Sequence, residues 1–579
     1  MTKIHKQTAS ILTRDGIRLD ADIYYPDTDT DLPVLLMRQP YGRAIASTVV
    51  YAHPSWYAAQ GYIVVIQDVR GRGTSGGEFQ LFTHEVADGI DTINWVSQLP
   101  GSNGQVGMYG FSYQGMTQLY AASANLPALK TICPAMMAYD LYADWAYENG
   151  AFCFHINFGW GVQLAAETAR LKNDPIAYQI LYAASRNLPF YDLSPRFIEC
   201  LNKYTPNSFY DEWQNHPEPG DYWQKLSPNL DGVDLPMLHI GGWFDPYLRG
   251  NLRLYKDLAK RSKFPQHLII GPWAHLPWGR KVGARDFGAE AVSPVDRLQV
   301  RWFDQFLKGI DTGLLDKPPV YLFEMGSNQW RYFDSWLQDN QKSYFLSSTG
   351  LASVRDDSGT LLSCPVEDSR LGGDKAEGQK EGNNDSLGGL DIIPQSESPA
   401  KLPVLPAATD VFVHDPWRPV PAWGGHATIP AGSFDRSAID SRTDVLTYNS
   451  APFAEDLHLM GDVAIEVFCY SDTSSFDLCA VLSEVLPNGM VYNFTQGYAT
   501  VSLGQEIKPV RIELQPTCMK ITKGNGLRLS LSAACFPAYP VNPGTGVSSA
   551  ETFMMDAQII TVTVNCGGNL TSKLLLPIA

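Results

Sequence analysis

The sequence has no long uninterrupted run of hydrophobic residues and no apolar segment near its N-terminus. A membrane-spanning helix needs about 20 consecutive apolar residues, and a secretory leader needs an apolar stretch close to the first residue. Basic residues are also in deficit, with 44 lysines and arginines against 61 aspartates and glutamates and a net charge of −17. This charge argues against nucleic acid or an anionic membrane as a partner. We therefore expect a soluble, cytoplasmic protein.

Cysteines are few and dispersed, nine in 579 residues, and none forms a Cys-x-x-Cys pair. This pattern favours reduced thiols in the core over a disulfide framework or a zinc site. The histidines show no metal-ligand spacing either. The glycine-rich stretch 68–77 lacks the Gly-Lys-Ser/Thr ending of a P-loop, so we interpret it as a tight turn. Neither a metal nor a cofactor is expected.

A short stretch around Ser112 has the layout of a nucleophile elbow. Residues 105–109 form an apolar run of strand length, Gly110 and Gly115 flank the serine, and residues 116–125 are rich in helix-forming residues. A serine at such a turn is exposed at the carboxyl end of the strand, and the following helix directs its positive end toward a developing oxyanion. The second glycine falls one position later than usual, so a serine in an ordinary tight turn is the alternative.

The predicted elements divide the chain into segments of different character. Residues 1–140 and 231–340 alternate continuous apolar runs, such as 62–67, with stretches of helical period. This alternation predicts an α/β fold, with a mostly parallel sheet and helices on both faces. Residues 141–230 lack buried strand patterns and are aromatic and helical, which indicates a helical cap inserted between sheet strands.

The remaining segment, residues 341–579, is dominated by strand patterns separated by Gly, Pro and Asn turns. Many strands with almost no helix predict an all-β sandwich, most simply a jelly roll. Within this segment, residues 350–400 are polar and rich in glycine and charge. We interpret them as a flexible insertion.

Two further residues complete a candidate site with Ser112. A serine hydroxyl is a weak nucleophile at neutral pH and needs a base within hydrogen-bond reach, which a carboxylate must orient. Asp245 follows one predicted buried strand and His275 follows the next. Serine, aspartate and histidine thus occur in the chain order of the α/β hydrolases, each at a strand end. Singly, Asp245 could cap a helix and His275 could be a core imidazole; jointly the three predict a catalytic triad.

Motifs spread over nearly the whole chain are typical of one group of enzymes. They are Pro40-Tyr-Gly-Arg43, Asp68-Val-Arg-Gly-Arg-Gly-Thr-Ser-Gly-Gly77, Gly110-Phe-Ser-Tyr-Gln-Gly115, Gly242-Trp-Phe-Asp245, Gly271-Pro-Trp-Ala-His275 and Phe536-Pro-Ala-Tyr-Pro-Val-Asn-Pro-Gly-Thr-Gly546. With them the chain resembles the cocaine esterase / X-Pro dipeptidyl-peptidase (CocE/NonD) family of serine hydrolases. That family also contains α-amino-acid ester hydrolases and glutaryl-cephalosporin acylases. Its elbow has the displaced second glycine seen here.

The resemblance implies a role for each matching residue. Ser112 would be the nucleophile, His275 the general base and then acid, and Asp245 the orienting carboxylate. The oxyanion hole would combine the backbone N–H of Tyr113 with the hydroxyl of Tyr41. The family's architecture of catalytic α/β domain, helical cap and C-terminal jelly roll agrees with the pattern described above.

The resemblance also suggests how substrate is held. In the cocaine esterase type, an aromatic residue two places past the triad aspartate packs on the acyl group; Tyr247 has that position, with Trp145 and Trp160 as further candidates. Amino-acid ester hydrolases place acidic residues just after that aspartate, and this cluster is missing here. Asp144 and Glu148, four residues apart, could hold a cation if helical, although a solvated helix face is the simpler interpretation.

The predicted function is hydrolysis of small-molecule carboxylic esters, and by extension amides, through an acyl-Ser112 intermediate. An X-Pro dipeptidyl-peptidase and a β-lactam side-chain acylase are the alternatives within enzymes. A binding module, in which the jelly roll binds and the α/β part is inert, is the alternative outside them. Because the family is often dimeric, a homodimer is a further expectation.

Overall fold

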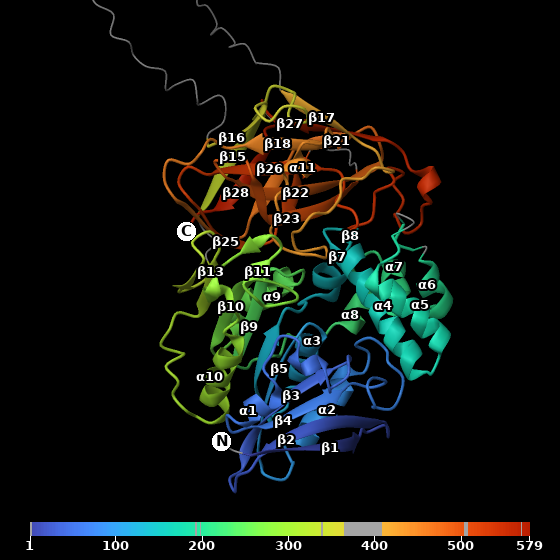
Figure 1. The fold of residues 1–579 in the computed structure, drawn as a ribbon, viewed down its shortest axis with the longest axis vertical. Helices are drawn as coiled ribbons and strands as arrows, with labels where there is room; N and C mark the ends of the chain where they lie inside the picture. The colour runs from blue at the N-terminus through green and yellow to red at the C-terminus, as the bar shows by residue number, and fades with distance from the viewer. Residues whose placement is uncertain are drawn as a thin grey trace, which may run out of the picture.

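The computed structural model describes residues 3–190, 194–196, 198–336, 340–363, 408–502, 508–568 and 570–579. The α/β part and the β-rich C-terminal part follow each other along the long axis, and a helical part stands to one side between them (Figure 1). Most of the predicted insertion at 350–400 lies outside the described residues. In the described part of the chain, no helix combines the length and the apolarity that crossing a bilayer requires.

The α/β part is built on one ten-stranded sheet with the strand order β1-β2-β4-β3-β5-β6-β9-β10-β13-β14. The strands from β4 to β13 in this order pair in parallel, and antiparallel strands lie at both edges. The central strands are buried because helices cover both faces, as their continuous apolar runs predict. The strands are β1 (Ile4–Leu12), β2 (Arg18–Pro26), β3 (Leu32–Gln39), β4 (Ile63–Asp68), β5 (Ser102–Phe111), β6 (Leu129–Ala135), β9 (Met237–Phe244), β10 (Gln266–Ala274), β13 (Val320–Glu324) and β14 (Gln329–Phe333).

Two separate hydrophobic clusters show which helix covers which face. Helices α2 (Glu85–Val96), α3 (Tyr113–Ala122) and the inner side of α9 (Leu248–Arg261) share a cluster with alternate residues of the central strands. The opposite side chains of the same strands pack against α1 (Pro54–Ala58) and α10 (Val295–Leu307). The predicted α/β class, with helices on both faces, is therefore confirmed.

The helical cap lies between β6 and β9 in the chain, and Figure 1 shows it standing beside the carboxyl ends of the sheet strands. Its helices are α4 (Phe154–Leu171), α5 (Pro175–Arg186), α6 (Glu199–Tyr204), α7 (Phe209–Asn215) and α8 (Asp221–Leu226). The segment leading into them differs from the prediction. Asp144 lies in a π-helical turn, and Glu148 lies in a short hairpin of β7 (Tyr147–Glu148) and β8 (Ala151–Phe152), so the two residues do not share a helix face.

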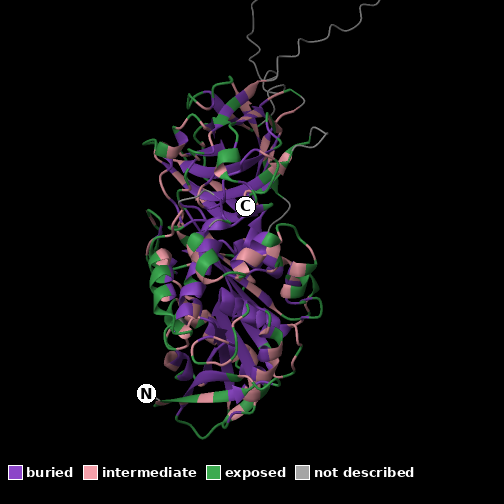
Figure 2. Cartoon of the chain, turned by 90° about the vertical axis from the view of Figure 1, so that its right-hand side faces the viewer, coloured by how far each residue is buried: buried purple, intermediate pink, exposed green. Residues whose placement is uncertain are grey.

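The C-terminal part is rich in strands, as predicted, and also holds a short helix, α11 (Ser437–Asp440). Its nine-stranded sheet, of order β23-β22-β26-β18-β16-β15-β28-β20-β24, is accompanied by the small sheets β17-β27-β21 and β19-β25. The central strands of both large parts are buried, whereas exposed residues lie on outer helix faces, on loops and on the N-terminal edge strand β1 (Figure 2). The strands are β15 (Gln341–Ser348), β16 (Gly359–Leu362), β17 (Thr409–His414), β18 (Val445–Asn449), β19 (Leu457–Gly461), β20 (Ala464–Val467), β21 (Cys469–Ser471), β22 (Ser475–Val485), β23 (Val491–Ser502), β24 (Val510–Glu513), β25 (Thr517–Ile521), β26 (Gly526–Ser532), β27 (Ile560–Asn565) and β28 (Lys573–Pro577).

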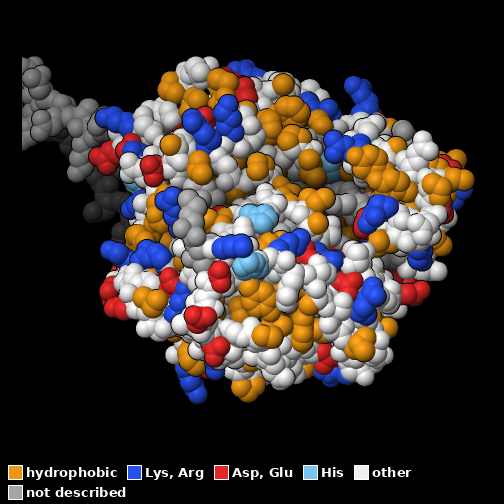
Figure 3. Space-filling model, turned by 60° about the horizontal axis from the view of Figure 1, so that its bottom comes forward, with side chains coloured by type: hydrophobic (Ala, Val, Ile, Leu, Met, Phe, Trp, Pro, Cys, Tyr) orange, Lys and Arg blue, Asp and Glu red, His pale blue; other side chains and the backbone are white. Residues whose placement is uncertain are grey.

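The surface carries both signs of charge. On the face shown in Figure 3, acidic and basic side chains are interspersed with hydrophobic ones, and neither sign forms a continuous field. The negative net charge is therefore not gathered into one patch on this face.

Candidate active site

Ser112 occupies a sharp turn between β5 and α3. Its backbone has φ 61° and ψ −127°, a conformation that non-glycine residues rarely adopt and that marks functional turns. The displaced second glycine has a steric reason: a Cβ at Gly115 would lie 2.7 Å from the carbonyl oxygen of Ala135 on β6. Helix α3 can approach the sheet this closely only because residue 115 has no side chain.

Asp245 and His275 meet at the carboxyl ends of neighbouring strands. Strands β9 and β10 are parallel and adjacent, and each residue directly follows its strand. His275 Nδ1 lies 2.7 Å from Asp245 Oδ1, and the Asp245 side chain is completely buried. Burial raises the pKa of this carboxyl, and the hydrogen bond from His275 opposes the rise. The carboxylate is thus placed to orient the imidazole and to stabilise its protonated form.

A second contact holds Asp245 from the C-terminal part of the chain. The side-chain amide Nε2 of Gln515 donates a hydrogen bond of 2.8 Å to the backbone carbonyl of Asp245. Gln515 is buried, and it lies 270 positions further along the chain. Sequence reasoning missed this residue, and no local pattern around it signals the contact.

The Tyr41 hydroxyl lies close enough to the Ser112 side chain for Ser112 to counteract part of the rise that burial causes in the pKa of Tyr41. Trp160 of α4 donates a further hydrogen bond of 3.1 Å from Nε1 to the same hydroxyl. Burial raises the pKa of Tyr41 to about 12, so the phenol keeps its proton at neutral pH and can donate it to an oxyanion. Among the described residues no hydrogen bond joins Ser112 to His275; in hydrolases without substrate this contact is often long or poorly aligned.

Tyr113 begins α3, so its backbone N–H has no partner earlier in the helix. Its side chain is anchored away from Ser112: the phenol donates a hydrogen bond of 2.6 Å to Glu85, which is ion-paired with Arg38 at 2.6 Å. All three side chains are buried. The Tyr113–Glu85 hydrogen bond, supported by the Glu85–Arg38 ion pair, anchors the first turn of α3. These contacts therefore fix the direction of the Tyr113 backbone N–H. Sequence reasoning missed Arg38 and Glu85, because an arginine at the end of a buried strand carries no specific signal.

The aromatic residues proposed for the substrate pocket form one continuous group with the imidazole. The Tyr247 ring meets His275 edge to face at 5.1 Å, Trp145 packs on Tyr247 at 4.3 Å, and Trp160 packs on Trp145 at 5.2 Å. The Phe82 ring contacts Tyr113, Trp145 and Trp160 and so extends this aromatic group. The sequence pattern did not indicate Phe82 either. The structure thus places all the predicted site side chains in one region.

Asp144 and Glu148 are both buried and both paired, contrary to the expected solvated face. Asp144 is ion-paired with Arg253. Glu148 is ion-paired with Arg249 at 2.7 Å and also contacts His426 and Tyr539. Each of the two carboxylates therefore already has a cationic partner.

Comparison with known proteins assigns the chain to a family. Residues 15–277 match the family model for X-Pro dipeptidyl-peptidase (S15 family), and residues 312–574 match the model for the X-Pro dipeptidyl-peptidase C-terminal non-catalytic domain. The chain belongs to the cocaine esterase / X-Pro dipeptidyl-peptidase group of serine hydrolases. The cocaine esterase of Rhodococcus sp. (strain MB1 Bresler) is 28% identical over 595 residues, covering 98% of this chain and 97% of that protein. A putative serine esterase of Mycobacterium bovis is 23% identical, covering 92% and 91%.

Two solved structures share the whole architecture of this chain. An aminopeptidase from a marine sediment Thaumarchaeota archaeon superposes with a TM-score of 0.78 at 22% identity, and it covers 100% of this chain and 97% of its own. An α-amino acid ester hydrolase gives a TM-score of 0.74 at 21% identity, with the same coverage. At these identities the likeness establishes the fold. The named activities of these proteins differ, so the group alone does not set the substrate.

Proposed function

We propose that the protein hydrolyses carboxylic esters of small molecules through an acyl-Ser112 intermediate. The observation that carries this proposal is the hydrogen bond between the buried Asp245 and His275, at the carboxyl edge of the sheet that also bears the Ser112 turn. The names of the cocaine esterase and the putative serine esterase among the relatives support an ester substrate.

The proposed reaction has two acyl-transfer steps. His275 removes the proton of Ser112 as its oxygen bonds to the substrate carbonyl carbon, and Asp245 stabilises the imidazolium. The oxyanion accepts hydrogen bonds from the Tyr113 N–H and the Tyr41 hydroxyl. When the tetrahedral intermediate collapses, the ester C–O bond breaks and His275 returns the proton to the leaving alcohol. Water then attacks the acyl-enzyme by the same steps and releases the acid.

The surroundings of the imidazole favour an apolar, bulky acyl group. Tyr247, Trp145 and Trp160 are buried aromatic side chains that contact one another beside His275, so a flat hydrophobic group placed against them would meet rings and not charged side chains. We propose that these residues form the acyl pocket.

The second candidate activity is cleavage after an X-Pro unit, which the names of the matching family models support. It needs an anion for the free N-terminus, and Asp144 and Glu148 are already paired.

We propose an α/β-hydrolase domain at 1–140 and 231–340, a cap at 141–230 and a jelly roll at 341–579. The dispersed cysteines and negative charge support a cytoplasmic site of action. From the family resemblance we also propose a β-lactam side-chain acylase activity as an alternative, and a homodimer.

A substrate panel with a covalent probe tests the function. Purified protein is given p-nitrophenyl esters of increasing acyl size, an X-Pro p-nitroanilide and a side-chain-acylated β-lactam, and it is labelled in parallel with a fluorophosphonate. We expect ester turnover and an adduct that maps to Ser112 and is absent from Ser112→Ala. Turnover confined to the X-Pro substrate would establish the peptidase instead. No adduct and no turnover would favour the binding-module alternative.

A further inference from the structure

Tyr41 lies in a loop whose two ends are tied to the same buried carboxylate. Gln39 donates a hydrogen bond of 3.0 Å from Nε2 to Asp68 Oδ1, and the backbone N–H of Arg43 donates one of 2.7 Å to the same oxygen. The guanidinium of Arg43 bonds the other carboxylate oxygen. Between these two anchors, the Tyr41 N–H donates a hydrogen bond of 2.9 Å to Gln39 Oε1. The loop therefore has little freedom to move.

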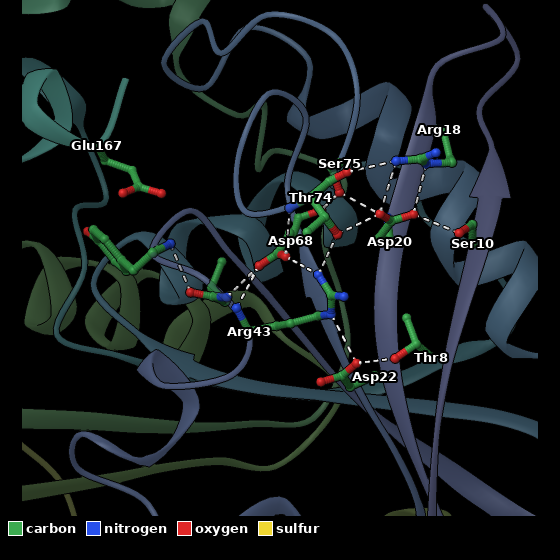
Figure 4. Close-up of polar contacts among 12 residues, drawn as sticks. Thr8, Ser10, Arg18, Asp20, Asp22, Arg43, Asp68, Thr74, Ser75 and Glu167 are labelled. Carbon is green, nitrogen blue, oxygen red and sulfur yellow. Dashed lines mark hydrogen bonds and ion pairs between the residues drawn. The ribbon is translucent and has the colours of Figure 1, made fainter. Parts of the chain in front are cut away.

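The anchors belong to rigid parts of the sheet. Asp68 ends β4, and Gln39, at the end of β3, is its registered partner across the parallel pair. The Asp68 side chain is completely buried. Figure 4 shows Arg43 placed between Asp68 and Asp22, and its Nε lies 3.0 Å from Asp22 Oδ1 on β2. The Arg43 side chain, which is only 13% exposed, thus links the loop to two strands.

The glycine-rich stretch 68–77 is folded around this carboxylate. Gly73 has φ +56°, and a Cβ there would lie 1.9 Å from Asp68 Oδ2. The neighbouring Thr74 accepts a hydrogen bond of 2.9 Å from Arg43 and donates one of 2.6 Å to Asp20. The stretch was interpreted as a tight turn, and the close approach to Asp68 is the physical reason for glycine at residue 73. It encloses the ion pair and limits its contact with water.

This cluster is an ion-pair network and not a cation site. Its three carboxylates each have a basic partner: Asp68 has Arg43, Asp22 has Lys6 and Arg43, and Asp20 has Arg18. Burial raises the pKa of Asp68, and the contacts with Arg43 oppose the rise. The function of the network must therefore be sought in what it positions.

We propose that Asp68 and Arg43 are positioning residues for the Tyr41 hydroxyl, holding its loop so that this hydroxyl stays directed at the oxyanion formed on Ser112. The inference rests on the proposed function, in which Tyr41 is an oxyanion donor. An oxyanion donor is effective because its position is fixed before the reaction, and a displacement of about 1 Å costs roughly 10²-fold in rate. A tyrosine on a free loop would lose this advantage. The network removes that freedom without touching substrate.

A double-mutant cycle tests whether Arg43 acts through Tyr41. We measure kcat and KM on a p-nitrophenyl ester for the parent, Arg43→Gln, Tyr41→Phe and the double variant. Arg43→Gln should lower kcat by roughly 10- to 100-fold with little change in KM. In the Tyr41→Phe background the same substitution should cost less than about 3-fold, because the group it positions is already gone.

Two further variants separate this role from a general loss of structure. Arg18→Gln removes an arginine of the same cluster that contacts Asp20 and the carbonyl of Thr74 but not the Tyr41 loop, and it should leave kcat unchanged. Arg43→Lys keeps the charge but cannot reach Asp22 and Asp68 together, so it should restore part of the lost kcat. If Arg43→Gln does not fold, the cycle is run with Arg43→Lys.

The outcomes distinguish this inference from the proposed function. Equal losses from Arg43→Gln in both backgrounds would overturn the positioning role and leave the oxyanion role of Tyr41 intact. A Tyr41→Phe variant as active as the parent would overturn both the oxyanion role of Tyr41 and the inference. Fluorophosphonate labelling of Ser112 in either case would still support the hydrolase function.

Discussion

Glu148 lies where the cap, the α/β part and the C-terminal part of the chain meet, so replacing it by glutamine tests what holds the three together. It belongs to the β7–β8 hairpin, its partner Arg249 belongs to α9, and His426 and Tyr539 come from the C-terminal part. All four side chains are largely buried, and His426 Nε2 and the Tyr539 hydroxyl lie 2.9 and 2.5 Å from Glu148 Oε2.

The size of the stability loss expected for Glu148→Gln follows from the charges around Glu148. Burial alone would raise the pKa of Glu148, but Arg249 and His426 overcome it and bring the pKa to about 2, against an ordinary 4.5. That difference corresponds to about 3 kcal/mol for the charged form. Because the folded-state pKa is lowered, this stabilisation is fully present above pH 4.5 and is lost as pH falls toward 2. Removing one partner of a buried ion pair independently suggests a loss of about 3–5 kcal/mol.

The assay is urea unfolding at pH 7, followed by far-UV circular dichroism and by tryptophan fluorescence. We expect Glu148→Gln to lower the free energy of unfolding by about 3 kcal/mol. The matched control is Glu167→Gln, because Glu167 pairs with Arg170 on the exposed side of α4, and a loss below about 0.5 kcal/mol is expected there. A Glu148→Gln variant within about 1 kcal/mol of the parent would refute the reasoning, since a buried cation left without its carboxylate must cost more.

Three further substitutions test the site and the C-terminal part. Tyr41→Phe should lower kcat by roughly 10²–10³-fold with unchanged thermal stability, and equal rates would remove Tyr41 from the oxyanion hole. Gln515→Ala breaks the contact to the Asp245 carbonyl and should lower kcat on esters by roughly 10-fold; unchanged kcat would show that the contact is not needed to hold the loop. Burial raises the pKa of Asp477 to about 6. The native state therefore binds its proton more tightly than the unfolded state, and the stability this contributes is lost as pH rises from about 4 through about 6. Asp477→Asn should flatten that part of the urea-stability profile between pH 4 and 8, and a profile identical to the parent's would contradict it.

The sequence predicts best those features that depend on local pattern. Residues 62–67 are a continuous apolar run, and β4 is fully buried because helices cover both sides of it. The positions of Asp245 and His275 directly after predicted strands suffice to place them together, since parallel neighbours end at the same edge of a sheet. Features of this kind need no knowledge of distant contacts.

The segment around Asp144 and Glu148, which leads into the helical cap, shows where local sequence pattern fails to predict the structure. The spacing of Asp144 and Glu148 fits a helix face, but their environment is set by Arg253 and Arg249 on α9, about a hundred residues away. Charged groups are buried there only because their partners are present. Propensity and periodicity contain no information on such a partner, so a solvated face was the natural expectation and it was wrong.

The same reasoning applies to the residues that position the site. Arg43 and Asp68 lie in recognisable motifs, yet nothing in the motifs shows that the arginine crosses to Asp22 while its own backbone N–H returns to Asp68. Gln515 has no motif and reaches Asp245 from the C-terminal part. In this fold the reacting groups lie at the carboxyl ends of strands, and the sequence pattern predicts where those strands end. Groups that only hold them can come from any element that packs nearby, so the structure is needed to find them.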